Sequence, residues 1–230
     1  MPAPEVRPVD PVGVDGDLAG HLVVPDLPLP RPGVVVLPEV DGYNPSTVAA
    51  ARRLGEAGYV ALSLDLFAPF GGTPPLADRQ TIGAWLRGMD DRRQLSDLAA
   101  AVGWLARRPE TDEDRLGIVG FSVGGRYGML LSAEPHGVSA VVTFSTRPWP
   151  GGAAAATALA PGDRVARLGA PVCAVFGDRD RVIPSEMVRR FADLLPDRAG
   201  HEVHVVPGGH LFANETSGQY EPASAEAAKR

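Results

Sequence analysis

Residues that could carry out nucleophilic chemistry are gathered around Ser122. The segment Gly120-Phe121-Ser122-Val123-Gly124 fits the pattern Gly-x-Ser-x-Gly and follows the apolar run Leu116–Val119. In this pattern a tight turn between a strand and a helix exposes the serine hydroxyl, and the start of the helix places backbone N–H groups beside it. A serine hydroxyl is a weak nucleophile until a base removes its proton. The interpretation therefore depends on finding an acid and a histidine elsewhere in the chain.

Both partners are present, in the order that a triad on an open parallel sheet requires. Asp180 follows the apolar run Val172–Phe176, and His210 follows the run Val203–Val206. Because the carboxyl ends of parallel strands line one crevice, we expect Ser122, Asp180 and His210 to meet there. His210 would take the proton of Ser122 and later return it, while Asp180 orients the imidazole ring.

Two alternatives stay open from the residues alone. Asp178 is a rival acid because it lies closer to the end of its strand, although the Gly-x-x-Asp spacing favours Asp180. The glycine-rich turn could instead cradle a phosphate. A dinucleotide site would need an acid after the next predicted strand, Val138–Phe144, but Ser145-Thr146-Arg147 stands there. No Gly-Lys-Ser/Thr follows the turn either, so the nucleophile interpretation is favoured.

The elements that would position these residues alternate along the chain between strand-like and helix-like patterns. Continuous apolar runs indicate strands buried on both faces. They are Val34–Leu37, Tyr59–Leu64, Leu116–Val119, Val138–Phe144 and Val172–Phe176, with shorter candidates at Leu22–Val24 and Val203–Val206. Helical patterns begin at Asn44-Pro45-Ser46, extend over Leu95–Leu105, follow Ser185 as a candidate cap and recur from Ala223. The alternation predicts a single α/β domain over residues 1–230, with a mainly parallel central sheet flanked by helices on both faces. The segment Arg147–Gly169 is predicted to be a long surface excursion.

Composition narrows the possible partners and compartments. The chain has 230 residues, 44% of them apolar, and a formal net charge of −6. It has no basic run, so neither nucleic acid nor an anionic membrane is an expected partner. The single cysteine, Cys173, allows no internal disulfide, and the N-terminus lacks the basic and apolar regions of a signal peptide. We expect a cytoplasmic monomer or homodimer that acts on a small molecule.

The motifs together resemble those of the dienelactone hydrolase family of α/β-hydrolases. The matching segments are Gly120–Gly125, with serine in place of the usual cysteine, Asp180 four residues before Pro184, Gly209-His210-Leu211-Phe212, and Glu39–Asn44. Lactone-degrading members of that family hold the substrate carboxylate with arginines. This chain has Asn214 at one of those positions, and Arg79 falls near the other.

The resemblance implies a serine-dependent hydrolase of small carboxylic esters or lactones that works through an acyl-enzyme on Ser122 and needs no cofactor. The backbone N–H groups of Val40 and Val123 would form the oxyanion hole. The implied substrate-binding residues are Glu39, Tyr43, Phe67, Arg79 and Trp149, and Glu39 could equally be a buried structural acid. Two other functions stay open: an acyltransferase or cyclase of a biosynthetic pathway that uses the same triad, and a non-catalytic small-molecule binding protein.

Other residues that could bind a metal receive a structural interpretation. His201 and His204 are three residues apart on a predicted strand, so they should point to opposite faces and be solvated. Cys173 lies inside an apolar strand, which is typical of a small core residue. No metal site is predicted.

Overall fold

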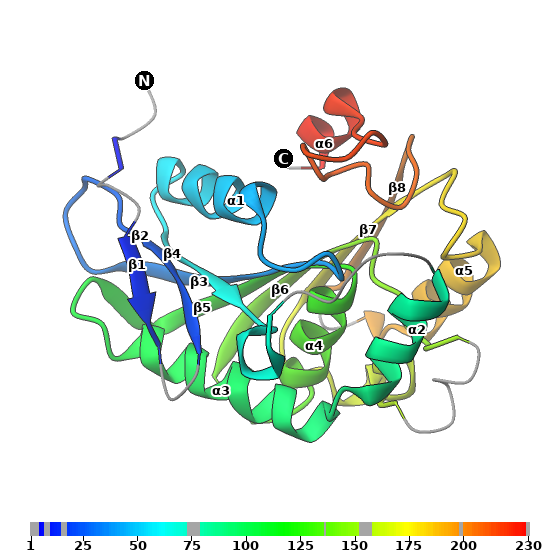
Figure 1. The fold of residues 1–230 in the computed structure, drawn as a ribbon, viewed down its shortest axis with the longest axis horizontal. Helices are drawn as coiled ribbons and strands as arrows, with labels where there is room; N and C mark the ends of the chain where they lie inside the picture. Colours follow the sequence, from blue (N-terminus) through cyan, green and yellow to red (C-terminus); the bar gives the residue numbers. More distant parts are fainter. Residues whose placement is uncertain are drawn as a thin grey trace.

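The computed structural model describes residues 5–6, 10–14, 18–72, 79–135, 137–151, 158–197 and 200–228. They form an eight-stranded sheet with the order β1-β2-β4-β3-β5-β6-β7-β8 (Figure 1). The strands are β1 Asp10–Gly13, β2 Ala19–Val23, β3 Arg31–Leu37, β4 Val60–Asp65, β5 Thr111–Phe121, β6 Val138–Phe144, β7 Val172–Gly177 and β8 Glu202–Val206. From β4 to β8 all neighbours are parallel, whereas β1 and β2 pair antiparallel at one edge. The prediction of an α/β fold with a mainly parallel sheet is confirmed.

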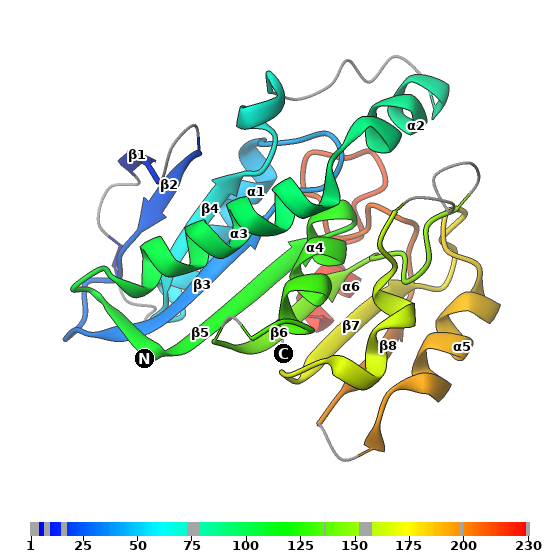
Figure 2. The ribbon, with the colours of Figure 1, turned by 90° about the horizontal axis from the view of Figure 1, so that it is seen from below.

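Helices cover both faces of this sheet. They are α1 Pro45–Glu56, α2 Arg79–Gly88, α3 Asp91–Ala106, α4 Val123–Ser132, α5 Ser185–Leu194 and α6 Pro222–Ala227. Helices α1 and α6 lie on one face, and α3, α4 and α5 lie on the other (Figures 1 and 2). None of the helices in the described part of the chain is long and apolar enough to span a bilayer.

Local sequence explains where the first and fifth helices begin. The Asn44 side chain accepts hydrogen bonds from the N–H groups of Ser46, at 2.9 Å, and Thr47, at 3.2 Å, so it caps α1 as predicted. The cap predicted for α5 was wrong by one residue. Ser185 is the first helical residue, and Pro184 holds the cap position in an extended conformation without a side-chain hydrogen bond.

Two elements were not predicted. Strand β1 has the sequence Asp-Pro-Val-Gly, which contains only one residue that favours strands. Helix α2 carries Thr81 and Gly83 in its interior, and both lower the helical signal.

The hydrophobic core has a large and a small side. The larger cluster lies under α3, α4 and α5 and includes Leu62, Leu98, Ile118 and Leu130, each at most 1% exposed. Smaller clusters lie on the opposite face under α1 and α6. The strands therefore bury apolar side chains on both faces, which is why their sequences read as continuous apolar runs.

The excursion between β6 and β7 is anchored to the helix that follows Ser122. Within it, single 3-10 turns cover Pro161–Asp163 and Val165–Arg167, and residues 152–157 lie outside the described part of the chain. Arg126 of α4 donates to the Leu159 carbonyl oxygen and forms a bidentate ion pair with Asp91 at the start of α3. Asp91 also accepts from the Leu159 N–H and the Tyr127 hydroxyl, both at 2.7 Å. This polar network joins α3, α4 and the excursion.

Candidate active site

Ser122 occupies the turn between β5 and α4 in a conformation that few non-glycine residues adopt. Its φ is 47° and its ψ is −109°. The turn is held by the Ser122 N–H, which donates to the Phe144 carbonyl oxygen at 2.8 Å, and by the Thr146 hydroxyl, which donates to the Ser122 carbonyl oxygen at 3.1 Å. Backbone strain of this kind persists only where the surrounding structure enforces it.

The two glycines of the Gly-x-Ser-x-Gly pattern are required by close packing. A Cβ on Gly120 would lie 2.4 Å from the Gly125 Cα, and a Cβ on Gly124 would lie 2.5 Å from the Pro38 carbonyl oxygen. The Gly124 N–H donates to that same oxygen at 3.1 Å. The turn is therefore bound directly to the loop that follows β3.

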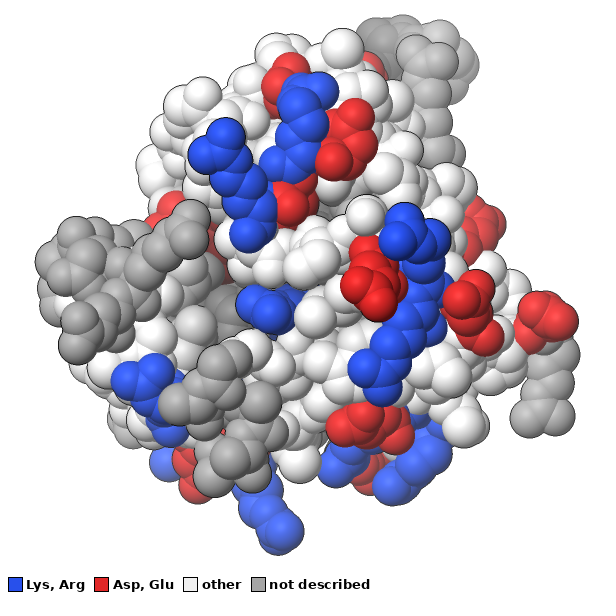
Figure 3. Space-filling model, turned by 90° about the vertical axis from the view of Figure 1, so that its right-hand side faces the viewer, with Lys and Arg blue, Asp and Glu red and all other residues white. Residues whose placement is uncertain are grey.

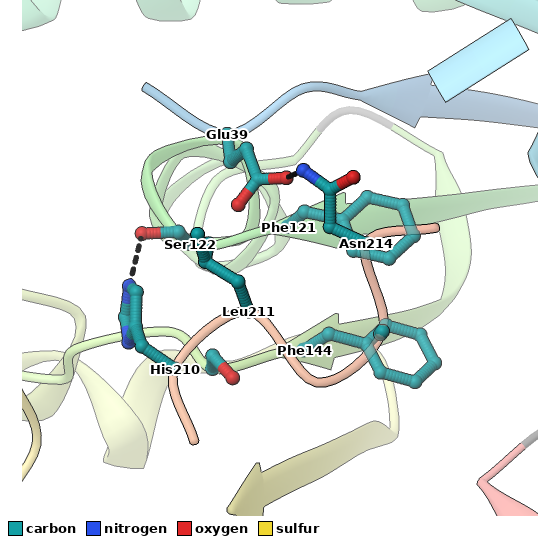
Figure 4. A pocket seen from close by; sticks show the side chains of 9 residues that line it. Glu39, Phe121, Ser122, Phe144, His210, Leu211 and Asn214 are labelled. Atoms are coloured by element: carbon teal, nitrogen blue, oxygen red, sulfur yellow. Dashed lines mark hydrogen bonds between the residues drawn. The ribbon is translucent and has the colours of Figure 1, made fainter. Parts of the chain in front are cut away.

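Ser122, His210 and Asp180 form a continuous chain of hydrogen bonds. The Ser122 Oγ lies 3.1 Å from His210 Nε2 (Figure 4). On the other side of the ring, His210 Nδ1 lies 2.8 Å from Asp180 Oδ2. Because the Asp180 carboxylate can only accept, Nδ1 carries the proton in the neutral ring, and Nε2 is free to accept the proton of Ser122. The three residues come from the ends of β5, β7 and β8, as predicted from their order in the chain.

Asp180 is held as a carboxylate. Burial on its own would raise its pKa, but the hydrogen bond and charge of His210 outweigh that effect and hold the pKa below its usual range. The N–H groups of Val182, at 2.7 Å, and Ile183, at 3.0 Å, donate to Asp180 Oδ1 and act in the same direction.

The backbone N–H groups of Val40 and Val123 have no acceptor among the described residues. Val123 begins α4, so its N–H has no partner within the helix. Val40 lies in the loop that contacts the Ser122 turn through Pro38 and Gly124. No hydrogen bond found in the described part of the chain uses either the Val40 or the Val123 N–H.

A pocket of about 10 Å³, which is room for about one water molecule, lies beside Ser122. Its lining consists of Glu39, Phe121, Ser122, Phe144, Ser145, His210, Leu211, Ala213 and Asn214 (Figure 4). Of these, sequence reasoning had assigned only Glu39, Ser122 and His210 to the site. Phe144 and Ser145 could have been found, since Phe144 ends β6, the strand next to the one carrying the nucleophile, and Ser145 follows it. Leu211 and Ala213 follow His210 directly in the chain.

Glu39 is the one acidic side chain in this lining. It is only 6% exposed, and its carboxyl oxygen Oε1 accepts a hydrogen bond from the Asn214 amide. Burial, reinforced by the nearby charge of Asp41 and opposed by the Asn214 bond, raises the pKa of Glu39 to about 8. Glu39 is therefore a neutral hydrogen-bonded acid at neutral pH.

Of the other predicted substrate-binding residues, Phe67, Trp149 and Tyr43 do not line this pocket. Phe67 is fully buried and packs edge-on against Trp85, with ring centroids 4.7 Å apart. Trp149 donates from Nε1 to Asp163 at 2.7 Å and packs against Phe191. The Tyr43 hydroxyl bonds to His21. Arg79 is the first residue of α2, and its side chain lies outside the described part of the structure.

Positive and negative side chains are intermixed on the face of the molecule that Figure 3 shows. Figure 3, which faces the right-hand side of Figure 1, shows Arg side chains interspersed with Asp and Glu among the described residues. The described part of that face offers no continuous basic surface for a polyanion.

Known proteins resemble this chain in sequence. The sequence model of the dienelactone hydrolase family matches residues 18–230. The chain belongs to the dienelactone hydrolase family. A family member from Bradyrhizobium, named "Probable 2-oxo-3-(5-oxofuran-2-ylidene)propanoate lactonase", is 30% identical over 225 residues, which cover 94% of this chain and 88% of the relative. The carboxymethylenebutenolidase of Pseudomonas putida is 25% identical over 217 residues, covering 92% and 87% of the two chains.

Solved structures agree on the fold. The crystal structure of a Klebsiella pneumoniae protein described as a dienelactone hydrolase superposes with a TM-score of 0.87 at 24% identity, covering 98% of this chain and 95% of that chain. The predicted family and the predicted hydrolase class are therefore confirmed.

Proposed function

We propose that this dienelactone hydrolase family member hydrolyses small carboxylic esters or lactones through an acyl-enzyme on Ser122. The observation that carries the proposal is the hydrogen-bonded series from Ser122 Oγ through His210 to Asp180 Oδ2, at 3.1 and 2.8 Å. The names of the relatives, a lactonase and a carboxymethylenebutenolidase, agree with that substrate class.

In the first half-reaction, Ser122 Oγ bonds to the substrate carbonyl carbon while its proton passes to His210 Nε2. Asp180 stabilises the imidazolium that forms. The carbonyl oxygen becomes an oxyanion, which we assign to the unpaired N–H groups of Val40 and Val123. The intermediate collapses by breaking the bond to the leaving oxygen, and that oxygen takes the proton from His210.

In the second half-reaction, a water molecule takes the place of the Ser122 hydroxyl as the nucleophile. It gives a proton to His210 and attacks the acyl carbon, and the bond to Ser122 Oγ then breaks as the proton returns to the serine. Glu39 stays neutral near pH 7, so it places no negative charge beside the oxyanion. We assign Glu39 and Asn214 to shaping the pocket wall.

The pocket beside Ser122 is too small to hold an ester, so we infer that the substrate lies across its mouth, where the lining offers no positive charge. None of the nine lining residues is an arginine or lysine, and Asn214 pairs with Glu39. We therefore expect a neutral ester to react faster than the same ester carrying a carboxylate on its acyl part.

The test is hydrolysis of short-chain p-nitrophenyl esters by the wild-type chain and by Ser122→Ala, together with fluorophosphonate labelling. Turnover and labelling should vanish together in the variant, and peptide mapping should place the label on Ser122. Ser145 lines the same pocket, so a label on Ser145 would contradict the assignment. Labelling without release of acid, with acyl transfer to an added alcohol, would instead favour the acyltransferase alternative. A folded chain with neither labelling nor turnover would favour the binding-protein alternative.

A further inference from the structure

A second group of side chains with possible metal-ligand atoms lies near the starts of β7 and β8, the strands whose other ends lead to Asp180 and His210. Cys173 is near the start of β7, and Glu202 and His204 are at the start of β8. In the parallel register Cys173 pairs with Glu202, and Val175 pairs with His204. Side chains two residues apart on a strand share a face, so all three project from the same side of the sheet.

The three side chains bring different ligand atoms close together. One ligand atom from each, the Cys173 Sγ, a carboxylate oxygen of Glu202 and a ring nitrogen of His204, lies within 4.8 Å of the other two. His204 Nε2 and Glu202 Oε2 are already hydrogen-bonded at 2.7 Å. A metal ion bound at about 2.0 to 2.3 Å from each ligand atom would need a small rearrangement, because the hydrogen-bonded nitrogen and oxygen must move apart to bind one ion.

These side chains open onto a groove between α1 and α6, the two helices above the sheet in Figure 1. The groove has a volume of about 610 Å³. Apart from the three side chains, most of its lining is apolar, with Leu54 on α1 and Val119 and Val142 on the sheet among the walls. The Arg53 guanidinium also reaches the groove but is ion-paired with Glu215.

This placement corrects one sequence-based interpretation and adds to another. Cys173 was expected in the core, but it is only partly buried and faces the groove. His204 was expected to be solvated, and its side chain is 51% exposed, but it is also hydrogen-bonded to Glu202. The other histidine, His201, lies before β8, where its Nδ1 accepts from the Val172 N–H at 3.0 Å. The relevant neighbours of His204 thus lie two residues away and on the adjacent strand.

We propose that Cys173, Glu202 and His204 form a binding site for a divalent transition-metal ion, with Zn²⁺ the best match. A thiolate, an imidazole and a carboxylate together are ligands that zinc accepts, whereas Mg²⁺ and Ca²⁺ prefer oxygen ligands alone. Three protein ligands leave one tetrahedral position, which faces the groove and would hold water or a small ligand.

Binding is accompanied by a defined proton change. The Cys173 S–H bond breaks, its proton goes to solvent, and a sulfur–metal bond forms. His204 binds through Nε2 and keeps its remaining proton on Nδ1, so the ion replaces the hydrogen bond to Glu202 Oε2. None of the three proposed ligands lines the Ser122 pocket, although the groove and that pocket share Phe121, Phe144 and Ala213 as walls, so ester hydrolysis needs none of the ligands.

The experiment uses the untagged full-length chain, stripped of metal and titrated with Co²⁺ as a spectroscopic probe and then with Zn²⁺. Because Cys173 is the only cysteine in the chain, any thiolate-to-cobalt charge-transfer band reports on this residue. We expect such a band, its displacement by Zn²⁺, and slower reaction of Cys173 with a thiol reagent when Zn²⁺ is present. Cys173→Ser should abolish the band, and His204→Ala should weaken Co²⁺ binding at least tenfold.

His201→Ala is the matched control, since it removes a histidine from the same sheet edge outside the proposed ligand set. It should leave the affinity within about twofold, and all three variants should keep wild-type ester turnover. Absence of a charge-transfer band in the folded wild-type chain would overturn the proposal. So would binding that His204→Ala and His201→Ala weaken equally, because that result describes nonspecific surface binding.

Discussion

Asp178 and Asp180 are separated by one residue, yet their carboxylates bind different parts of the chain. Asp178 Oδ1 accepts the Gly208 N–H at 2.8 Å, whereas Asp180 Oδ2 bonds to His210 Nδ1 at 2.8 Å. One acid thus fixes the backbone of the loop after β8, and the other contacts the imidazole that the loop carries. The geometry favours Asp180 over the rival acid.

Exchanging each acid for its amide separates these roles. Asp180→Asn should lower kcat/KM by about a thousandfold or more, because an amide cannot hold the Nδ1–H tautomer and the imidazolium as a carboxylate does. Asp178→Asn keeps an oxygen for the Gly208 N–H and should change kcat/KM by less than about tenfold. Steady-state kinetics on one ester, with circular dichroism as a control for folding, provides the measurement. A larger loss in Asp178→Asn than in Asp180→Asn would reverse the assignment.

Glu39 should make both stability and activity depend on pH. Its pKa is raised from 4.5 to about 8 in the folded chain, so the native state binds one more proton than the unfolded state between these values. The stability is therefore full below pH 4.5, declines as pH rises and levels off above about pH 8. The total decline attributable to Glu39 should be about 2 to 5 kcal/mol.

The variant Glu39→Gln tests this because glutamine can still accept from Asn214 but has no proton to lose. Its free energy of unfolding relative to wild type should rise between acidic and alkaline pH in urea titrations. Its ester turnover should match wild type near neutrality and exceed it above about pH 8, where ionised Glu39 would oppose the oxyanion. Parallel pH profiles for the two proteins would show that Glu39 does not ionise in this range.

Asp91 should contribute far more to stability than an acid in an exposed pair. Burial alone would raise its pKa, but the Arg126 guanidinium outweighs burial and holds the pKa below its usual range. Asp91→Asn should cost about 2 to 4 kcal/mol, because it leaves Arg126 without its charge partner in a site where both side chains are at most 13% exposed.

Asp97 provides the comparison for Asp91. It pairs with Arg93, whose side chain is 52% exposed, so Asp97→Asn should cost less than about 1 kcal/mol. The Asp91 contribution is present above the ordinary pKa of an aspartate and is lost as pH falls through the depressed value. The difference between the two variants should therefore shrink in strong acid. If the two variants lose the same free energy of unfolding at neutral pH, the Asp91–Arg126 pair contributes no more to stability than the exposed pair does.

The contact between the Ser122 turn and the Val40 loop can be tested with two glycine substitutions. Gly124→Ala would put a methyl group 2.5 Å from the Pro38 carbonyl oxygen, so we expect a loss of about 1 to 3 kcal/mol and a displaced Val40 N–H. Its kcat should fall more than its KM rises. Gly117→Ala in β5, where the nearest atom would be 3.5 Å away, should change both values little. If Gly124→Ala loses stability but keeps its kcat, the position of the Val40 loop does not affect stabilisation of the oxyanion.

The sequence predicted most of the sheet because its strands are covered on both faces. For the same reason it could not show which face of β7 is open. Val172, Cys173, Ala174, Val175 and Phe176 form one apolar run, and only the folded structure shows that Cys173 faces a groove between α1 and α6. The triad could be predicted because each member follows a recognisable strand. The Glu39–Asn214 bond joins residues 175 apart in the chain and has no local pattern, so it becomes visible only in the folded structure.

The separation of the triad along the chain also makes it a reporter of folding. Ser122 and His210 are 88 residues apart, and the strand that delivers His210 is at the edge of the sheet. Contacts between such distant residues form late and cannot arise in a chain that has assembled only its helices or its central strands. During refolding, recovery of covalent labelling at Ser122 should therefore lag behind recovery of the far-UV circular dichroism signal. A burst assay with an activated ester would then count completely folded molecules where spectroscopic probes of secondary structure count partly folded ones as well.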